Sequence, residues 1–350
     1  MRWARLLGMI ALGGMVCACQ PAPAAPSRAP AAPAPAAPPA AEAAPAPATL
    51  TALRIGQTSI NAALVPFWLA ADNGAFAAQG LAVDAVLMRG SVEGIAALAS
   101  GDAMLLLGGP SPAFVSAAKD TGLVVVGTTN NRLQYQIVGN VRSLPELRGK
   151  VVGVSRLGDT SQYLVVQALE RAGMHQDDVR YLGVGNIPQR TAALLSGQID
   201  ATPVVVPSNL QALKAGYFQV ADLGDMDIPY IGASVLLRRQ DGERQPDIVE
   251  RFLKGLIQGV RAVTAEPEQA RAALRRHLDL TDDEEVEATY QDNVKGLEPW
   301  LAPSLAGLQD VIDQAAAENP SLAGVRVGDL VDMHYVEAIR ASGFDPAQTP

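Results

Sequence analysis

The sequence predicts an α/β protein built from two similar lobes. From residue 53 short apolar strands alternate with helical segments, an order typical of a parallel sheet covered by helices. The same order recurs from residue 151, and AALASG at 96–101 is matched by AALLSG at 192–197, an offset of 96 residues. After residue 230 the pattern turns helical. We therefore expect a chain that starts one lobe, builds a second and returns to the first.

Each half of the pattern can be followed element by element. The first runs from strand LRIG through loop QTSIN, helix VPFWLAADNGAF, strand LAVDAVLM and helix SVEGIAALASG to strand AMLLLGG. The second runs from strand VVGV through loop SRLGDTS, helix QYLVVQALERAG, strand VRYLGV and helix IPQRTAALLSG to strand DATPVVV. A glycine after a helix is common and is weak support by itself. Recurrence of the whole order is the stronger indication of two related lobes.

The helical tail needs a sheet to cover. Its expected helices are PDIVERFLKGLIQGVRAV, PEQARAALRRHL, EEVEATYQDNV, LAGLQDVIDQAAAEN and VEAIRASGF. Thr281 and Glu284 form an expected capping box before the third of these helices. We therefore assign 51–138 and 230–350 to the first lobe and 139–229 to the second. In open α/β sheets ligands bind beyond the carboxyl ends of strands, so we expect the site in a cleft between the lobes.

The N-terminal segment resembles an export signal. Residues 1–18 combine two arginines with an apolar run shorter than the roughly 20 residues that a membrane-spanning helix requires. Ala18 and Cys19 resemble the bacterial lipobox, so lipidation at Cys19 is expected, with ordinary cleavage at a nearby small residue as the alternative. In 21–50, 25 of 30 residues are Ala or Pro, which predicts an extended tether over 19–50. We expect an extracytoplasmic, lipid-anchored protein.

Charge and cysteine content exclude several functions. From residue 51 onward, 24 basic and 35 acidic side chains give a net charge of −11, which argues against nucleic acid as a partner. Both cysteines lie in the first 19 residues, which excludes disulfides and thiol catalysis from the folded part. His175, His277 and His334 lack metal-ligand spacing, and GVGNIPQ lacks the glycine spacing of a dinucleotide loop. We expect no cofactor, metal site or catalytic residue.

Several segments, in order, resemble one family of transport proteins. FWLAADNGAFAAQGLAVD, LASGDAMLLLGGPSPAFVSAAK, SLPELRGKVVGV, AALLSGQIDA and IVERFLKGLIQGVRAV are similar to periplasmic solute-binding proteins of ABC importers, in the nitrate, taurine, sulfonate and thiamine-pyrimidine group. The resemblance covers Leu53 to Phe344. It implies a type II periplasmic-binding fold, hinge closure on a small solute and delivery to a membrane permease with its ATPase.

The resemblance also implies where the solute binds. In this family the loops after the first and third strands and the first loop of the second lobe hold the ligand, and a strand end and the return crossing are weaker additions. Carried onto this chain, the expected contacts are Ser59, Asn61, Gly109, Pro110, Ser111, Arg156, Asp159, Thr160, Ser161, Gln162, Pro207 and Tyr230. Alternatives stay open: Ser59 and Asn61 as helix caps, GGPSP as a plain turn, and Tyr230 as hinge packing.

The loop SRLGDTSQY limits how far the family's ligands carry over. Family members that bind sulfonates tend to have Gly-Ser-Thr-Ser where this chain has GDTS, so an acid, Asp159, replaces a hydroxyl. That acid repels an anion and competes for the N–H groups of the helix start, although Arg156 offers a cation. An amine, amide or pyrimidine suits Asp159 better. Aromatic residues make up only 5% of the chain, which argues against a sugar cleft.

Three function classes follow. The resemblance implies a binding lipoprotein of an importer, with a sulfonate, taurine, nitrate or pyrimidine-type solute. The first alternative is an enzyme on the same fold, similar to a thiamine-pyrimidine synthase or a menaquinone-pathway dehydratase, but the synthase carries a cysteine-rich motif that this chain lacks. The second alternative is a lipoprotein that senses a ligand. We expect a non-enzyme whose partners are a small solute, permease and ATPase subunits, and a membrane reached through the N-terminal lipid.

Overall fold

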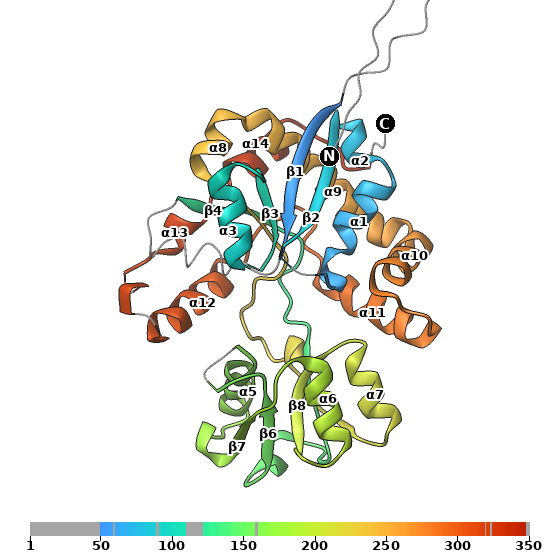
Figure 1. The fold of residues 1–350 in the computed structure, drawn as a ribbon, viewed down its shortest axis with the longest axis vertical. Helices are drawn as coiled ribbons and strands as arrows, with labels where there is room; N and C mark the ends of the chain where they lie inside the picture. Colours follow the sequence, from blue (N-terminus) through green and yellow to red (C-terminus); the bar gives the residue numbers. More distant parts are fainter. Residues whose placement is uncertain are drawn as a thin grey trace, which may run out of the picture. The chain divides into compact units, whose positions relative to one another are not determined.

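Two mixed sheets organise the part of the chain that the structure describes. The computed structural model describes residues 50–58, 60–88, 91–109, 122–157, 160–318, 320–322 and 324–347. Each sheet has five strands and is covered by helices (Figure 1). We call the sheet that contains the N-terminal strand, with its helices, the first lobe, and the other sheet with its helices the second lobe. The predicted signal, Cys19 and the tether up to residue 49 lie outside the described residues.

The first sheet combines parallel strands with one reversed strand. Its strands are β1 (Thr51–Gln57), β2 (Leu81–Leu87), β3 (Leu105–Gly108), β4 (Leu123–Thr128) and β10 (Ser234–Arg238). Their order in space is β2-β1-β3-β10-β4. β1 is parallel to β2 and β3, whereas β10 is antiparallel to β3 and β4. All residues of β3 and β4 are buried, as expected for apolar strands covered on both faces.

The second sheet repeats this plan. Its strands are β5 (Tyr135–Gly139), β6 (Val151–Val154), β7 (Arg180–Gly183), β8 (Ala201–Val205) and β9 (Phe218–Asp222). They lie in the order β7-β6-β8-β5-β9, with β6 parallel to β7 and β8 and with β5 antiparallel to β8 and β9. In each sheet the reversed strand is the first one after the chain arrives from the other lobe. The repeat in the sequence is thus a repeat of sheet plan.

Helices cover both sheets. In the first lobe they are α1 (Val65–Asp72), α2 (Ala75–Ala78), α3 (Ser91–Ser100), α8 (Arg239–Arg244), α9 (Pro246–Ala265), α10 (Pro267–Leu278), α11 (Asp283–Gly296), α12 (Leu305–Glu318), α13 (Val327–Leu330) and α14 (His334–Ala341). In the second lobe they are α5 (Thr160–Arg171), α6 (Ile187–Leu195) and α7 (Ser208–Lys214). Short 3₁₀ helices are η1 (Ala62–Leu64), η2 (Leu144–Leu147), η3 (Gln176–Asp178), η4 (Leu223–Asp225) and η5 (Pro320–Leu322). No helix among the described residues is long and apolar enough to cross a membrane.

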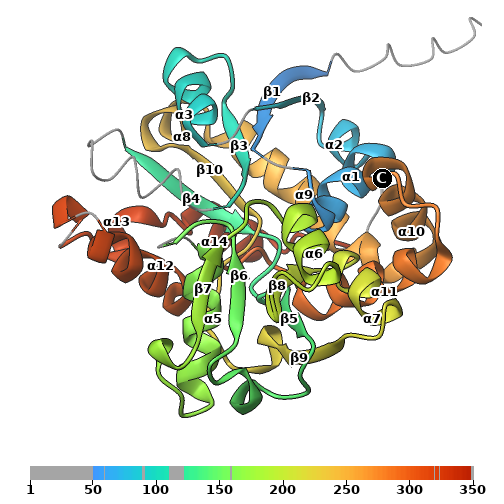
Figure 2. The ribbon, with the colours of Figure 1, turned by 60° about the horizontal axis from the view of Figure 1, so that its bottom comes forward.

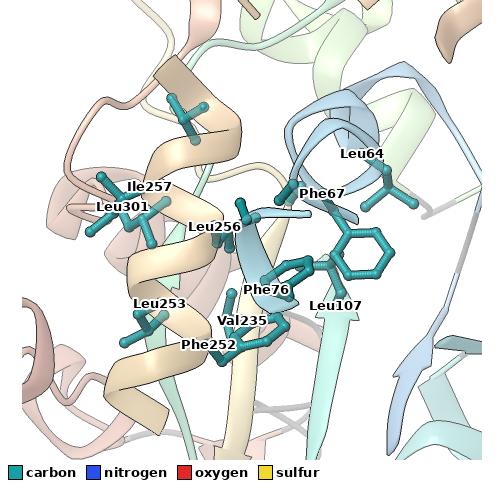
Figure 3. Packing of buried hydrophobic residues seen from close by; sticks show 14 of the residues in the cluster. Leu64, Phe67, Phe76, Leu107, Val235, Phe252, Leu253, Leu256, Ile257 and Leu301 are labelled. Atoms are coloured by element: carbon teal, nitrogen blue, oxygen red, sulfur yellow. The ribbon is translucent and has the colours of Figure 1, made fainter. Parts of the chain in front are cut away.

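Helix α9 supports the first sheet. Its buried residues, among them Phe252 and Leu256, recur at three- and four-residue spacing and form one apolar face. Figure 3 shows this face beside Phe76, whose ring stacks on that of Phe252 with centroids 5.1 Å apart. Gly259 allows α9 to approach α1 closely, because a Cβ there would lie 2.1 Å from the carbonyl oxygen of Pro66. The first lobe therefore has a tightly packed core behind the loops that follow its strands.

Two segments connect the lobes. The chain passes from β4 to β5 through 129–134, and it returns from η4 to β10 through 226–233. The expected boundary after residue 138 therefore falls inside β5, which belongs to the second sheet. The sequence did not reveal this because β5 pairs with strands about 60–90 residues later, for example Gly139 with Ala201 and Gln136 with Asp222.

The cap of helix α11 also differs from expectation. Asp282 caps this helix instead of Thr281, and its Oδ1 accepts hydrogen bonds from the backbone N–H groups of Glu284 at 2.7 Å and Glu285 at 3.3 Å. A carboxylate satisfies two free donors at the helix start and interacts favourably with the helix dipole. Helix α11 therefore begins at Asp283, directly after its cap.

Candidate functional site

A cavity of about 720 Å³ lies between the two lobes. Both lobes and both crossings contribute to its lining, through the loop after β1, the turn after β3, the end of β8, the start of α6 and one face of α11. We call it the first cavity. Its position at the carboxyl ends of β1, β3 and β8 is the one expected for a ligand site in α/β lobes.

The loop after β1 supplies Asn61. Its side chain caps η1, since Oδ1 accepts a hydrogen bond from the N–H group of Ala63 at 3.0 Å. The same residue lines the first cavity. Gly109, after β3, also lines it, and Gly108 just before has no room for a side chain, because a Cβ would lie 1.9 Å from Thr58 Oγ1. Capping and cavity lining are therefore compatible at Asn61.

Two tyrosines form an aromatic part of the wall. Tyr135 starts β5 at the end of the first crossing, and Tyr230 lies in the return crossing. Both are half-buried, and burial, with the nearby Tyr135 hydroxyl, raises the pKa of Tyr230 above its usual range. Pro207 and Ile187 of the second lobe add apolar surface to the same cavity. A flat, partly apolar ligand could be held by such a wall.

One face of α11 supplies the polar part of the wall. Thr289, Asp292 and Asn293 line the first cavity, at the three- and four-residue spacing that places side chains on one helix face. Gly296, one turn further, lies against the first crossing, where a Cβ would be 2.4 Å from Asn130 Nδ2. The backbone N–H of Asn131 donates to the carbonyl oxygen of Gly296 at 3.2 Å. The face of α11 is thereby fixed relative to the hinge.

A group of four charged side chains and one amide adjoins this wall, and two of its members, Gln134 and Asp292, line the first cavity. We call Arg132, Gln134, Asp222, Asp225 and Asp292 the hinge cluster. The Arg132 guanidinium contacts Asp225 Oδ1 at 2.7 Å, Asp222 Oδ1 at 3.2 Å and Asp292 Oδ1 at 3.4 Å. Gln134 Nε2 donates to Asp292 Oδ2 at 3.2 Å. Asp222 and Asp225 belong to the second lobe and Asp292 to the first, so Arg132 joins the two lobes.

The environment of Asp292 is unusual for a carboxylate. Its side chain is 11% exposed, and burial raises the pKa of Asp292 to about 6, with Arg132 opposing the shift and Asp222 adding to it. Of the described residues that line the first cavity, Asp292 alone carries a charge. The described wall therefore presents no cation to a ligand.

A second cavity, of about 610 Å³, adjoins the first and shares Tyr135, Ile187 and Pro188 with it. Arg156, Thr160 and Ser161 line this second cavity, at the start of α5. Ser161 Oγ accepts a hydrogen bond from the N–H group of Ser155 at 2.8 Å, which ties the loop to the first turn of α5. The opening loop of the second lobe thus lies beside the first cavity instead of inside it.

Two contacts join the lobes at the rim of the cleft. On one side the hydroxyl of Tyr163, in α5, donates to Asp310 Oδ2 of α12 at 2.5 Å. On the other side Lys214 Nζ, at the end of α7, lies 3.1 Å from Asp282 Oδ2 and 3.0 Å from Glu284 Oε2, where α11 begins. Figure 2 shows α7 beside α11. The lobes are held together on both sides of the cavities.

The predicted contacts separate into four groups. Asn61, Gly109, Pro207 and Tyr230 line the first cavity. The second cavity is lined by Arg156, Thr160 and Ser161, whereas Gln162 lines neither cavity. Ser59, Pro110, Ser111 and Asp159 lie outside the described residues, so the contribution of Asp159 stays a prediction.

The sequence did not point to α11 or to the first crossing. The segment DLTDDEEVE predicts an acidic helix start, and the polar residues after it follow no known motif. The sequence does contain their three- and four-residue spacing, which puts Thr289, Asp292 and Asn293 on one helix face. Only the structure shows that all three are at least nine-tenths buried. Buried polar residues on one helix face indicate a ligand site or a hydrogen-bond network, because these side chains do not face solvent.

Solved structures of periplasmic binding proteins share this fold. The aliphatic sulphonate binding protein SsuA from Escherichia coli has a TM-score of 0.63 at 22% identity, covering 77% of this chain and 93% of that one. A putative sulfonate-binding SsuA from Methylobacillus flagellatus has a TM-score of 0.65 at 19% identity, covering 86% and 98%. The desulfurization enzyme DszB also matches, with a TM-score of 0.63 at 15% identity, covering 83% and 100%. The protein thus has the periplasmic-binding-protein fold, as predicted.

The chain belongs to the NMT1/THI5-like family, whose model matches residues 61–270. Among curated proteins it is similar to the riboflavin-binding protein RibY of Chloroflexus aurantiacus, 27% identical over 283 residues, which is 73% of each chain. These matches confirm the predicted resemblance to the nitrate, taurine, sulfonate and thiamine-pyrimidine group. Together with the cavity between the lobes they support a substrate-binding role.

Proposed function

We propose that this chain is the extracytoplasmic solute-binding protein of an ABC importer and that it binds an uncharged heteroaromatic solute of the flavin or pyrimidine class. The observation that carries the proposal is the charge of the first cavity. Its described lining holds one carboxylate, Asp292, and no basic side chain. A sulfonate or nitrate would lose its water without gaining a cation and would lie near a carboxylate, which is unfavourable.

The size and surface of the cavity support the same solute class. A volume of about 720 Å³ lies within the range of pockets for drug-sized molecules, roughly 300–1,000 Å³. Nitrate or taurine would fill a small part of it. Tyr135 and Tyr230 offer ring faces and Asn61 and Gln134 offer amide groups, a combination that suits a flat ring with polar edges. RibY, by its name a riboflavin-binding protein, is consistent with this choice.

Hinge closure is the proposed mode of capture. Two crossings join the lobes, and the Arg132, Tyr163 and Lys214 contacts between the lobes would form or tighten as the lobes close on the solute. The closed protein would deliver the solute to a permease with its ATPase. Lipidation at Cys19 and the tether over 19–50 would keep the binding lobes near that permease.

A thermal-shift titration of the full chain tests the solute class. Riboflavin, an aminopyrimidine, taurine and nitrate are added separately. A flavin or pyrimidine at 100 times its dissociation constant should stabilise the protein by about 2.7 kcal/mol, which raises the melting temperature by several degrees. A shift with taurine or nitrate, and none with riboflavin or the aminopyrimidine, would overturn the proposed class.

An enzyme on the same fold is the competing function, because DszB shares the architecture. The complex of DszB with biphenyl-2-sulfinic acid was solved with a cysteine-to-serine mutant, and this chain has no cysteine after Cys19. We propose a binding protein without turnover. Riboflavin incubated with the chain should be recovered unchanged by chromatography, and a new product formed in proportion to the protein would contradict the proposal.

A further inference from the structure

Asp292 differs from every other described residue of the first cavity because it is charged and buried at once. Its carboxylate has two oxygens with about four acceptor positions in all. Arg132 approaches Oδ1 at 3.4 Å and Gln134 approaches Oδ2 at 3.2 Å, both long for hydrogen bonds to a carboxylate. Asp292 therefore keeps acceptor capacity at the wall of the cavity.

We infer that Asp292 determines specificity in this cavity by accepting a hydrogen bond from a ring N–H group of the solute. The inference rests on the proposed function and deepens it, since it names the chemical group that the site selects. A solute that fills the cavity removes the remaining water from Asp292. A buried carboxylate that loses water needs a donor in return, and a ring N–H supplies one.

Gln134 makes the recognised edge more specific. Its amide nitrogen has two N–H groups, and one of them donates to Asp292 Oδ2. The other can donate to a carbonyl oxygen beside the ring N–H. Asp292 and Gln134 together therefore match an N–H group next to a C=O group, the edge shared by pyrimidinediones and the flavin ring.

The next residue on α11 adds a second acceptor to the same wall. Asn293 is 1% exposed, and within the described residues its Oδ1 has no hydrogen-bond partner. Its Nδ2 donates to the carbonyl oxygen of Thr289 at 3.0 Å, which fixes the orientation of the amide. The α11 wall is thus rich in acceptors, and a ligand with donors complements it.

The charge of the hinge cluster favours a donor over an anion. Three carboxylates, those of Asp222, Asp225 and Asp292, share the Arg132 guanidinium. Arg132 therefore cannot neutralise Asp292 fully, and an anionic ligand group would meet net negative charge. Asp225 offers a matched control, because it contacts Arg132 but does not line the first cavity.

Two ligands separate this role from a structural one. Riboflavin has a ring N–H at N3, and 3-methylriboflavin carries a methyl group in its place. Both are titrated by fluorescence into the full wild-type chain and into the Asp292→Ala, Asp292→Asn and Asp225→Asn variants. Retained binding of the methylated flavin shows that a variant is folded.

The expected result is a preference that depends on Asp292 alone. Wild type and Asp225→Asn should bind riboflavin at least about tenfold more tightly than 3-methylriboflavin. Asp292→Ala should bind the two flavins within about threefold of each other, because the acceptor is gone, with Asp292→Asn in between.

Three other results would overturn the inference. Equal binding of both flavins by wild type, unaffected by Asp292→Ala, would leave the proposed function standing without this role. Equal weakening of both flavins by Asp292→Ala would assign Asp292 a structural role. Failure of wild type to bind either flavin would remove the proposed solute class and the inference together.

Discussion

The hinge cluster and the rim pair join the same two lobes, and both use acids at α11. They differ in how far their cations are exposed to solvent. We call Lys214 with Asp282 and Glu284 the rim pair. The side chain of Arg132 is 13% exposed, whereas that of Lys214 is 46% exposed. Breaking a buried ion pair leaves charges without solvent, but water replaces a lost surface partner. Burial, more than the number of ion pairs, should therefore decide which of these two contacts between the lobes contributes more to the free energy of unfolding.

The largest effect is expected from Arg132→Met. The change leaves Asp222 and Asp292, each with a side chain 11% exposed, without their cation. The free energy of unfolding should fall by about 3 kcal/mol, measured by urea denaturation. Arg326→Met is the control, because Arg326 is 82% exposed and pairs with Asp329 three residues away in the same lobe. A loss for Arg132→Met no larger than for this control would contradict the comparison.

The next effect is a pH dependence that depends on Asp292. Burial raises the pKa of Asp292 to about 6 from an ordinary 3.8, so the folded state binds more protons between these values. The contribution of Asp292 to stability is then fully present below 3.8 and is lost as pH rises through about 6. The groups that act on it are Arg132, Asp222 and Lys295, with Asp225 acting through Arg132.

Urea denaturation at pH 5 and pH 7 measures this contribution. From pH 7 to pH 5, the unfolding free energy of wild type should rise by on the order of 1 kcal/mol more than that of the Asp292→Asn variant. Riboflavin affinity should change in the opposite direction and weaken at pH 5, because a protonated Asp292 is a poor acceptor. The same pH response in Asp292→Asn as in wild type would show that another group titrates.

Tyr163→Phe should have a smaller effect. The change removes the hydroxyl that donates to Asp310 Oδ2 at 2.5 Å across the cleft. Because both residues are half-buried, we expect the unfolding free energy to fall by about 1 kcal/mol in urea denaturation. Tyr181→Phe is a matched control in the same lobe, since within the described residues the Tyr181 hydroxyl is buried without a partner. An equal loss in both variants would mean that the Tyr163 hydrogen bond contributes nothing.

The hinge cluster also shows which features the sequence could predict and which it could not. Strand and helix order follow from local periodicity, so two α/β lobes were predictable, and the family's loop positions led to Asn61 and Tyr230. The hinge cluster depends on contacts across 90 residues from Arg132 to Asp222 and 160 residues from Arg132 to Asp292. No local pattern encodes such pairs, because the partners meet only when both sheets and α11 are assembled.

The expected lobe boundary after residue 138 falls inside β5 for the same reason. Its residues show strand propensity, but only its pairing with β8 and β9 reveals which sheet it joins. The predicted boundary consequently puts the first crossing, which carries Arg132 and Gln134, inside the first lobe. Neither Arg132 nor Gln134 was among the expected contacts, although Gln134 lines the first cavity.

The smallest effect is expected from Lys214→Met. Both acids of the rim pair are about half exposed or more, at 45% for Asp282 and 66% for Glu284, and salt screens such charges. Unfolding in urea should match wild type within error. Riboflavin affinity should weaken by about threefold or less at low salt, because the closed state loses one attraction between the lobes. At about 0.5 M NaCl, where salt screens this attraction in wild type as well, the affinity should not change.

Lys254→Met is the matched control for this last variant. Lys254 lies 4.0 Å from Glu250 within α9, so its ion pair does not join the lobes. Its loss should leave riboflavin affinity unchanged at both salt concentrations. If Lys214→Met instead lowered the unfolding free energy as much as Arg132→Met, exposure would not decide the strength of an interlobe contact. The hinge cluster and the rim pair would then have to be treated as one network of contacts between the lobes.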